Sequence, residues 1–104
     1  MPTAKGSFSR TQNTLITATF VIDERQWDFI MTISSSIVAF TSNGAELTYN
    51  DLDELTSTRS FNGTIGREDF SIDLDNGLKI TGKLNKPYLM ERVGVDGTGK
   101  WVQH

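Results

Sequence analysis

Apolar residues alternate with polar ones along several short segments of this chain. Every second residue is apolar from Ile16 to Ile22 and again from Phe70 to Leu74. Successive side chains of a β-strand point to opposite faces, so a period of two predicts strands that bury one face. Thr and aromatic residues, which favour strands, are frequent in these segments, and Gly separates them. We therefore expect an all-β fold built from antiparallel hairpins.

Residues 70–84 predict a hairpin whose register can be argued from both of its faces. A two-residue turn at Asn76-Gly77 would place apolar side chains opposite polar ones. A three-residue loop over 75–77, with Gly77 at positive φ, keeps apolar residues together and pairs opposite charges. The expected pairs are Leu74–Leu78, Ile72–Ile80, Asp73–Lys79 and Asp69–Lys83.

The same criterion predicts two further hairpins. Residues 16–33 are expected to turn through a four-residue loop over 23–26, and residues 38–49 through the two-residue loop Asn43-Gly44. Each register keeps apolar residues on one face, because a slip of one residue would reverse every side chain. The expected inner pairs are Ile22–Trp27, Phe20–Phe29, Ala18–Met31 and Ile16–Ile33, then Phe40–Leu47 and Val38–Tyr49.

Residues Asn50–Arg59 carry the one helical signal in the chain. Asn50 is expected to cap a short helix, because acidic residues follow it and favour the amino end of a helix. Leu52 and Leu55 lie three residues apart, so they would share one side of this helix and plug a sheet. The remaining expected strands cover residues 60–66, 88–93 and 100–103.

These elements add up to about eight strands and one short helix. Closure removes unpaired strand edges, so we expect an antiparallel barrel or a flattened two-sheet sandwich. We expect residues 1–13, which are mostly polar, to form an N-terminal arm and residues 14–104 to form one barrel domain. The expected core consists of Phe20, Ile22, Trp27, Phe29, Met31, Phe40, Leu47, Leu52, Leu55, Phe70, Ile72, Leu74, Ile80 and Trp101.

Charge and cysteine content narrow the range of functions. The net charge is −3, there is no run of Lys or Arg, and there is no cysteine. Because nucleic-acid binding depends on a basic surface, a nucleic-acid partner is disfavoured. The lack of cysteine excludes disulfides, thiolate metal sites and cysteine nucleophiles. No segment approaches the ~20 apolar residues of a membrane-spanning helix.

Two motif matches and the only histidine argue against an enzyme. Gly94–Lys100 fits the first seven positions of a P-loop, but Trp101 stands where Ser or Thr should hold magnesium. We expect these glycines to form a hairpin turn before the last strand. Asp73–Gly77 loosely resembles a calcium loop but lacks its closing Glu, so we expect a turn. His104 is the last residue, which leaves no histidine-based triad or cluster. We expect no catalytic residue, cofactor or metal.

Four large aromatic residues are the candidate ligand-binding residues: Trp27, Tyr49, Tyr88 and Trp101. Aromatic side chains can line a pocket at the mouth of a barrel. The competing interpretation, which we prefer, is core packing, because each large aromatic buries ~150–250 Å² that a small domain needs.

The stretch Gly44–Leu55, followed by Phe61, resembles a segment of the secreted virulence-associated (Vap) proteins of actinobacterial pathogens. In that family a Leu-Tyr strand end runs into an Asp-Leu-x-x-Leu helix and then a strand that bears Phe. Residues 70–72 and 97–101 have looser counterparts there. The resemblance implies a compact eight-stranded barrel with one short helix and no catalytic residues. It favours secretion, as a mature chain without its signal peptide, over the cytoplasm.

Three functions from different classes fit these observations. The first is a non-enzymatic interaction protein, secreted and similar to the virulence-associated family. The second is a carrier of a small apolar ligand with lipocalin-like architecture, because a barrel of eight strands can hold one such ligand. The third is a carbohydrate-binding module, which would expose a Trp or Tyr flanked by Asp and Asn. The expected partner is accordingly a protein, a glycan or a small apolar ligand.

Overall fold

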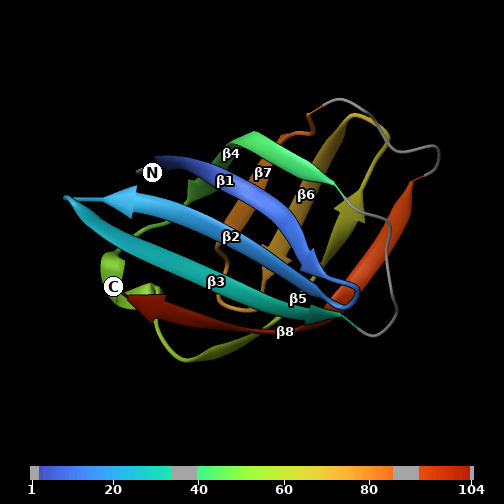
Figure 1. Ribbon diagram of the computed structural model, residues 1–104. Coiled ribbons are helices and arrows are strands. Elements are labelled where there is room, and N and C mark those ends of the chain that lie inside the picture. Colours follow the sequence, from blue (N-terminus) through green and yellow to red (C-terminus); the bar gives the residue numbers. More distant parts are fainter. Residues whose placement is uncertain (1–2, 34–39, 86–91, 104) are drawn as a thin grey trace.

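Eight antiparallel strands close into a barrel in the order β1-β2-β3-β8-β5-β6-β7-β4, and β4 pairs with β1. The computed structural model describes residues 3–33, 40–85 and 92–103, with the side chain of Leu52 excepted (Figure 1). The all-β prediction is confirmed, and of the two expected architectures the closed barrel is the one observed. The strands are β1 Thr3–Gln12, β2 Leu15–Ile22, β3 Arg25–Ile33, β4 Thr41–Thr48, β5 Thr58–Ile65, β6 Asp69–Leu74, β7 Lys79–Lys83 and β8 Val93–Gln103.

The N-terminal segment is a barrel strand, so the expected polar arm over residues 1–13 is wrong. Strand β1 pairs with β2 on one side and with β4 on the other. Most of its polar residues face outward, while Phe8 is fully buried and stacks on Phe70 with ring centroids 4.1 Å apart. A single buried aromatic in a polar stretch gives too weak an alternation to be recognised in sequence, and the pairing on both sides holds the strand in place.

The β6–β7 hairpin has the expected register. Ile72 lies opposite Ile80, Asp73 opposite Lys79, and the backbone N–H of Leu74 donates to the carbonyl of Leu78 over 2.9 Å. Gly77 has φ +91°, as the three-residue loop requires, and the Lys79 ammonium lies 3.6 Å from the Asp73 carboxylate.

The β2–β3 hairpin turns through two residues, so the four-residue loop expected over 23–26 is wrong. Asp23 and Glu24 have φ +52° and +67°, which is the twisted turn that suits a right-handed hairpin. Phe20 therefore lies opposite Trp27, and not opposite Phe29. The observed register differs from the expected one by two positions, which leaves every side chain on the predicted face. The pattern of apolar residues therefore fits both registers equally well.

Asn43 and Gly44 lie inside β4, so the hairpin expected over residues 38–49 is wrong. The pairing of β1 with β4 shifts by one position here, and both residues lie opposite the single residue Ser7, which is a β-bulge. Strand β4 pairs with β1 and β7 instead of with residues 38–40. Phe40 is buried as expected, but Val38 lies outside the described residues.

The helix expected over Asn50–Arg59 is reduced to one 3-10 turn, η1, over Leu52–Glu54. Its cap is Asp51 and not Asn50: the Asp51 carboxylate accepts from the N–H of Asp53 over 3.0 Å. The Glu54 carboxylate in turn accepts from the N–H of Asp51 over 3.0 Å, which completes a capping box. The helix cannot extend to Arg59 because β5 already begins at Thr58 and pairs with β8.

The glycine-rich segment Gly94–Lys100 is extended strand, so the turn expected there is wrong. It forms most of β8, which pairs with β3 and β5. Glycine is required by close approach: a Cβ on Gly97 would lie 2.1 Å from the carbonyl oxygen of Thr32, and one on Gly99 would lie 2.3 Å from the Phe29 ring. The separate strand expected over residues 88–93 falls mostly outside the described residues.

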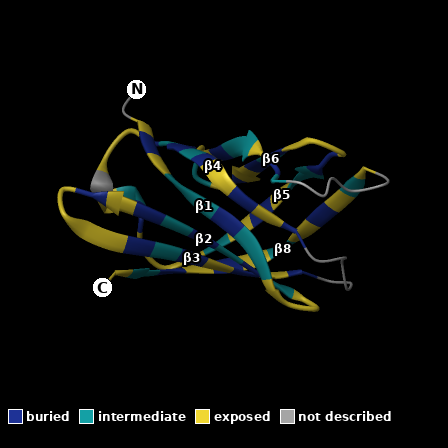
Figure 2. Ribbon diagram, turned by 45° about the horizontal axis from the view of Figure 1, so that its top comes forward, coloured by how far each residue is buried: buried dark blue, intermediate teal, exposed yellow. Residues whose placement is uncertain are grey.

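Inward-facing residues of all eight strands form the core, and Figure 2 shows buried and exposed residues alternating along the strands. Two aromatic groups fill the interior, one of Phe8, Phe40 and Phe70 and one of Phe29, Phe61 and Trp101. Every expected core residue whose side chain the structure describes is buried, and Leu52 is the exception that it does not describe.

Candidate functional site

The candidate aromatic residues lie in the core. Trp27, Tyr49 and Trp101 are 8%, 9% and 5% exposed, and Tyr88 lies outside the described residues. Trp101 packs on Phe29 with ring centroids 4.7 Å apart. Trp27 lies near the start of β3 and Trp101 near the end of β8, and these two strand ends pair with each other. None of the three described side chains offers a surface on which a sugar or an apolar ligand could stack from outside.

The acidic residues of the calcium-like stretch have structural roles. Asp73 forms the ion pair with Lys79, and the Asp75 carboxylate accepts from the N–H of Ser60 over 3.1 Å. In the part of the chain that the structure describes, no three His, Asp or Glu side chains come together as metal ligands would. Over the same residues, no helix has the length and apolar character needed to cross a membrane.

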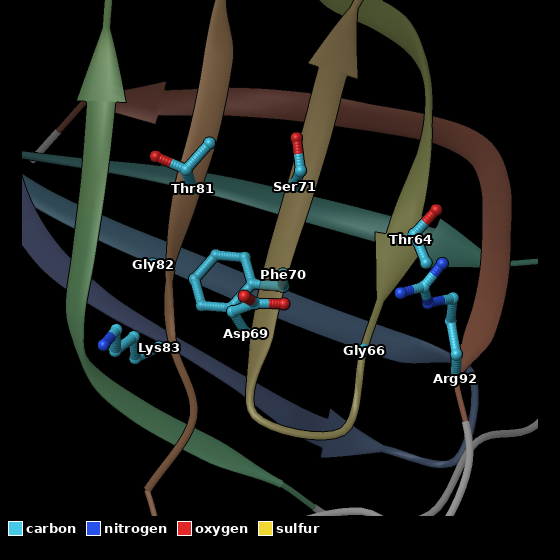
Figure 3. Close-up of a pocket in the computed structure, with 9 residues that line it drawn as sticks. All are labelled: Thr64, Gly66, Asp69, Phe70, Ser71, Thr81, Gly82, Lys83 and Arg92. Carbon is cyan, nitrogen blue, oxygen red and sulfur yellow. The ribbon is translucent and has the colours of Figure 1, made fainter.

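The surface hollows found among the described residues lie on the outside of the barrel. Four of them have volumes between about 210 and 420 Å³, and each is lined mainly by residues of the outer face. The largest, about 420 Å³, lies over β5, β6 and β7, and we call it the outer hollow (Figure 3). Its lining residues are Thr64, Gly66, Asp69, Phe70, Ser71, Thr81, Gly82, Lys83 and Arg92.

A row of three hydroxyl groups crosses the outer hollow. Thr64 on β5 lies opposite Ser71 on β6, which lies opposite Thr81 on β7. Figure 3 shows the three side chains next to one another on adjacent strands. All three are half-buried, and none of their hydroxyls has a hydrogen-bond partner among the described residues. Neighbouring strands are ~4.8 Å apart, so the row presents hydroxyls over about 10 Å.

Charged side chains border this hydroxyl row. Arg92 lies beside Thr64, and Lys83 lies on the opposite flank, with Asp69 between them (Figure 3). All three are exposed. Lys83 lies opposite Asp69 as expected, but the expected ion pair between them is wrong, because none of the three forms an ion pair with another described residue. A second hollow of about 340 Å³ adjoins the first, and Arg67 and Glu68 line it together with Gly66, Asp69 and Arg92. The two hollows thus hold three cations and two carboxylates, on a chain whose net charge is −3.

Gly82 lies opposite Phe70 on the inner face of the β6–β7 hairpin. A Cβ at Gly82 would lie 2.4 Å from the carbonyl oxygen of Gly44 and 2.9 Å from Cζ of Phe70. The missing side chain leaves room inside the barrel for the Phe70 ring, which stacks there on the fully buried Phe8. Phe70 is only 3% exposed, so its ring belongs to the core and offers no stacking platform to a ligand in the outer hollow.

Sequence reasoning did not identify the outer hollow. The predicted register of residues 70–84 does place Ser71 and Thr81 together on the outer face, and the structure confirms that pairing. Thr64 joins them only because β5 pairs with β6, and Arg92 only because the chain enters β8 beside them. No pattern in the linear sequence predicts that Thr64 or Arg92 lies beside Ser71 and Thr81.

A search with protein-family models finds no match to this chain, and neither curated proteins nor solved structures show significant similarity to it. The eight-stranded barrel is the architecture that the resemblance to the virulence-associated proteins implies, but an architecture alone does not test membership of that family. The function must therefore be argued from the residues of the outer hollow.

Proposed function

We propose that this protein is a non-enzymatic binding protein that recognises its partner with the outer face of β5, β6 and β7. The observation that carries the proposal is the outer hollow, where accessible hydroxyl and charged groups have no partner among the described residues. A ligand can bond to such groups without breaking bonds inside the protein. The volume of about 420 Å³ falls within the ~300–1,000 Å³ of known ligand pockets.

Core packing favours the outer face over the barrel interior. The carrier hypothesis needs an internal cavity, whereas the interior holds two aromatic groups whose ring centroids are 4.1–6.3 Å apart. Phe8, Phe20 and Phe29 are fully buried there. An apolar ligand could enter only by displacing packed side chains, which costs free energy in a well-packed core.

The resemblance to the virulence-associated proteins supports the same kind of function. The resemblance implies a protein without catalytic residues and favours secretion over the cytoplasm. Secretion and a protein or glycan partner are thus part of the proposal.

An NMR titration of the ¹⁵N-labelled protein tests the proposal. The probes are laurate, a phosphoserine heptapeptide, and short acidic and neutral oligosaccharides, each added to millimolar concentration. We expect at least one polar probe to shift the amide signals of Thr64, Ser71 and Thr81 and to leave those of Phe29 and Phe61 unchanged. Laurate shifting the signals of Phe29 and Phe61, with the outer face unaffected, would instead establish a carrier.

A further inference from the structure

We propose that the outer hollow binds a saccharide that carries a carboxylate, such as a uronic or sialic acid unit. This inference rests on the proposed function, because it names the ligand class of the same surface. It draws on the hydroxyl row and on the charges at its borders.

The hydroxyl row and Asp69 suit the hydroxyls of a sugar. Thr64, Ser71 and Thr81 each offer one donor and two acceptor lone pairs, and the Asp69 carboxylate accepts from two donors at once. A sugar ring presents hydroxyls that donate and accept in the same way along its rim. The repeat of ~4.8 Å between strands places these partners over the length of one to two sugar rings.

The cations at the border account for the acidic group. Arg92 and Lys83 lie on opposite flanks of the row and have no ion-pair partner among the described residues (Figure 3). The planar guanidinium of Arg92 can bind a carboxylate with two parallel hydrogen bonds. Arg67 adds a third cation in the adjoining hollow, which makes this region locally basic on an acidic chain.

Phosphorylated peptides fit the same surface less well. A phosphate carries about −1.5 to −2 charges at neutral pH, and Asp69 and Glu68 would repel it more strongly than they repel a single carboxylate. Sites for phosphate usually gather several Arg residues without acids between them. With a phosphopeptide bound, the three hydroxyls would also have no hydrogen-bond partner other than the phosphate itself. The mixed lining therefore favours a ligand with many hydroxyls and one negative charge.

The experiment compares acidic saccharides with neutral counterparts. The acidic probes are a hyaluronan tetrasaccharide, a trigalacturonate and sialyllactose, and the neutral ones are chitotetraose and lactose. Amide shifts in the ¹⁵N-labelled protein report both the position and the Kd. We expect at least one acidic probe to shift Thr64, Ser71 and Thr81 and to bind more tightly than the neutral probes.

Two variants assign the contacts, each with a matched control. Arg92→Gln is expected to raise the Kd of the acidic probe about tenfold, whereas Arg25→Gln, at the opposite end of the barrel, leaves it unchanged. Thr81→Ala is expected to raise it about threefold to tenfold, whereas Thr58→Ala, on an exposed site outside the hollow, has no effect. Hydrogen–nitrogen spectra of each variant establish that the barrel is intact.

Each other outcome overturns the inference. Equal binding of neutral and acidic saccharides, unaffected by Arg92→Gln, would show a neutral-sugar site and leave the proposed function standing. Tighter binding of the phosphoserine peptide at the same amides would show a phosphopeptide site. If no acidic saccharide shifts any outer-face amide at millimolar concentration, the inference is wrong. The proposed function fails separately, when laurate alone binds and the shifts lie inside the barrel.

Discussion

Replacing Phe8 by Ala tests whether β1 is an integral strand of the barrel. Phe8 is 0% exposed, stacks on Phe70 at 4.1 Å and packs on Phe40 at 5.5 Å. Replacing a buried Phe by Ala costs about 3–5 kcal/mol, a range that already includes its lost ring contacts. We expect a loss of about 4 kcal/mol, a large share of the roughly 5–15 kcal/mol that stabilises a domain of this size.

Urea unfolding, followed by tryptophan fluorescence, measures this loss. With a denaturant slope of about 2 kcal/mol per molar, the midpoint should fall by about 2 M. Lys5→Ala, on the outer face of the same strand, is the control and should change the stability by less than about 0.5 kcal/mol. Phe8→Leu keeps most of the volume and remains measurable if the Ala variant does not fold. A loss below about 1 kcal/mol for Phe8→Ala would mean that residues 3–12 are a loosely attached arm after all.

Three further substitutions probe other parts of the barrel. Gly77→Ala should destabilise by about 1 kcal/mol in urea unfolding, because φ +91° strains a residue with a Cβ although the space around it is open; a neutral result would contradict the assigned loop. Gly82→Ala should cost about 1–3 kcal/mol and shift the amides of β4 and β7, since its Cβ would lie 2.4 Å from a backbone oxygen; unchanged spectra would rule out so close an approach. Asn76→Asp removes the side-chain N–H that donates to the carbonyl of Glu54 over 3.2 Å, so hydrogen exchange at the Glu54 amide should accelerate about tenfold. Asn62→Asp, on the exposed face of β5, should not change that rate, and equal acceleration in both would assign the effect to added charge alone.

Where apolar and polar residues alternate strongly, the sequence predicts correctly which side chains face the core and which face outward. Residues 16–22 and 70–74 bury the residues that the pattern predicts. The β6–β7 register was also predictable, because the apolar face and the charged face independently require the same three-residue loop. Local information sufficed there, since both strands and their loop lie within fifteen consecutive residues.

Alternation with a period of two predicts which face of a strand is buried. It does not predict which strand pairs with it, and it does not distinguish registers that differ by two residues. This ambiguity explains the error in the β2–β3 loop, where Asp23 and Glu24 alone make the turn. It also explains why Asn43-Gly44, a strong hairpin signal in sequence, is a bulge: β1 occupies the place beside β4 that residues 38–40 were expected to take.

The outer hollow depends entirely on contacts between distant segments. The predicted hairpin brings Ser71 and Thr81 together, but Thr64 and Arg92 reach them only through the pairing of β5 with β6 and the path of the chain into β8. Closure of the barrel likewise depends on β1. The mostly polar sequence of this strand gives little indication that Phe8 is buried. The sequence by itself determined which faces are apolar and one complete hairpin, because these depend on neighbours along the chain. Only the tertiary structure decided which strands meet, because pairing across a closed barrel depends on all eight strands at once.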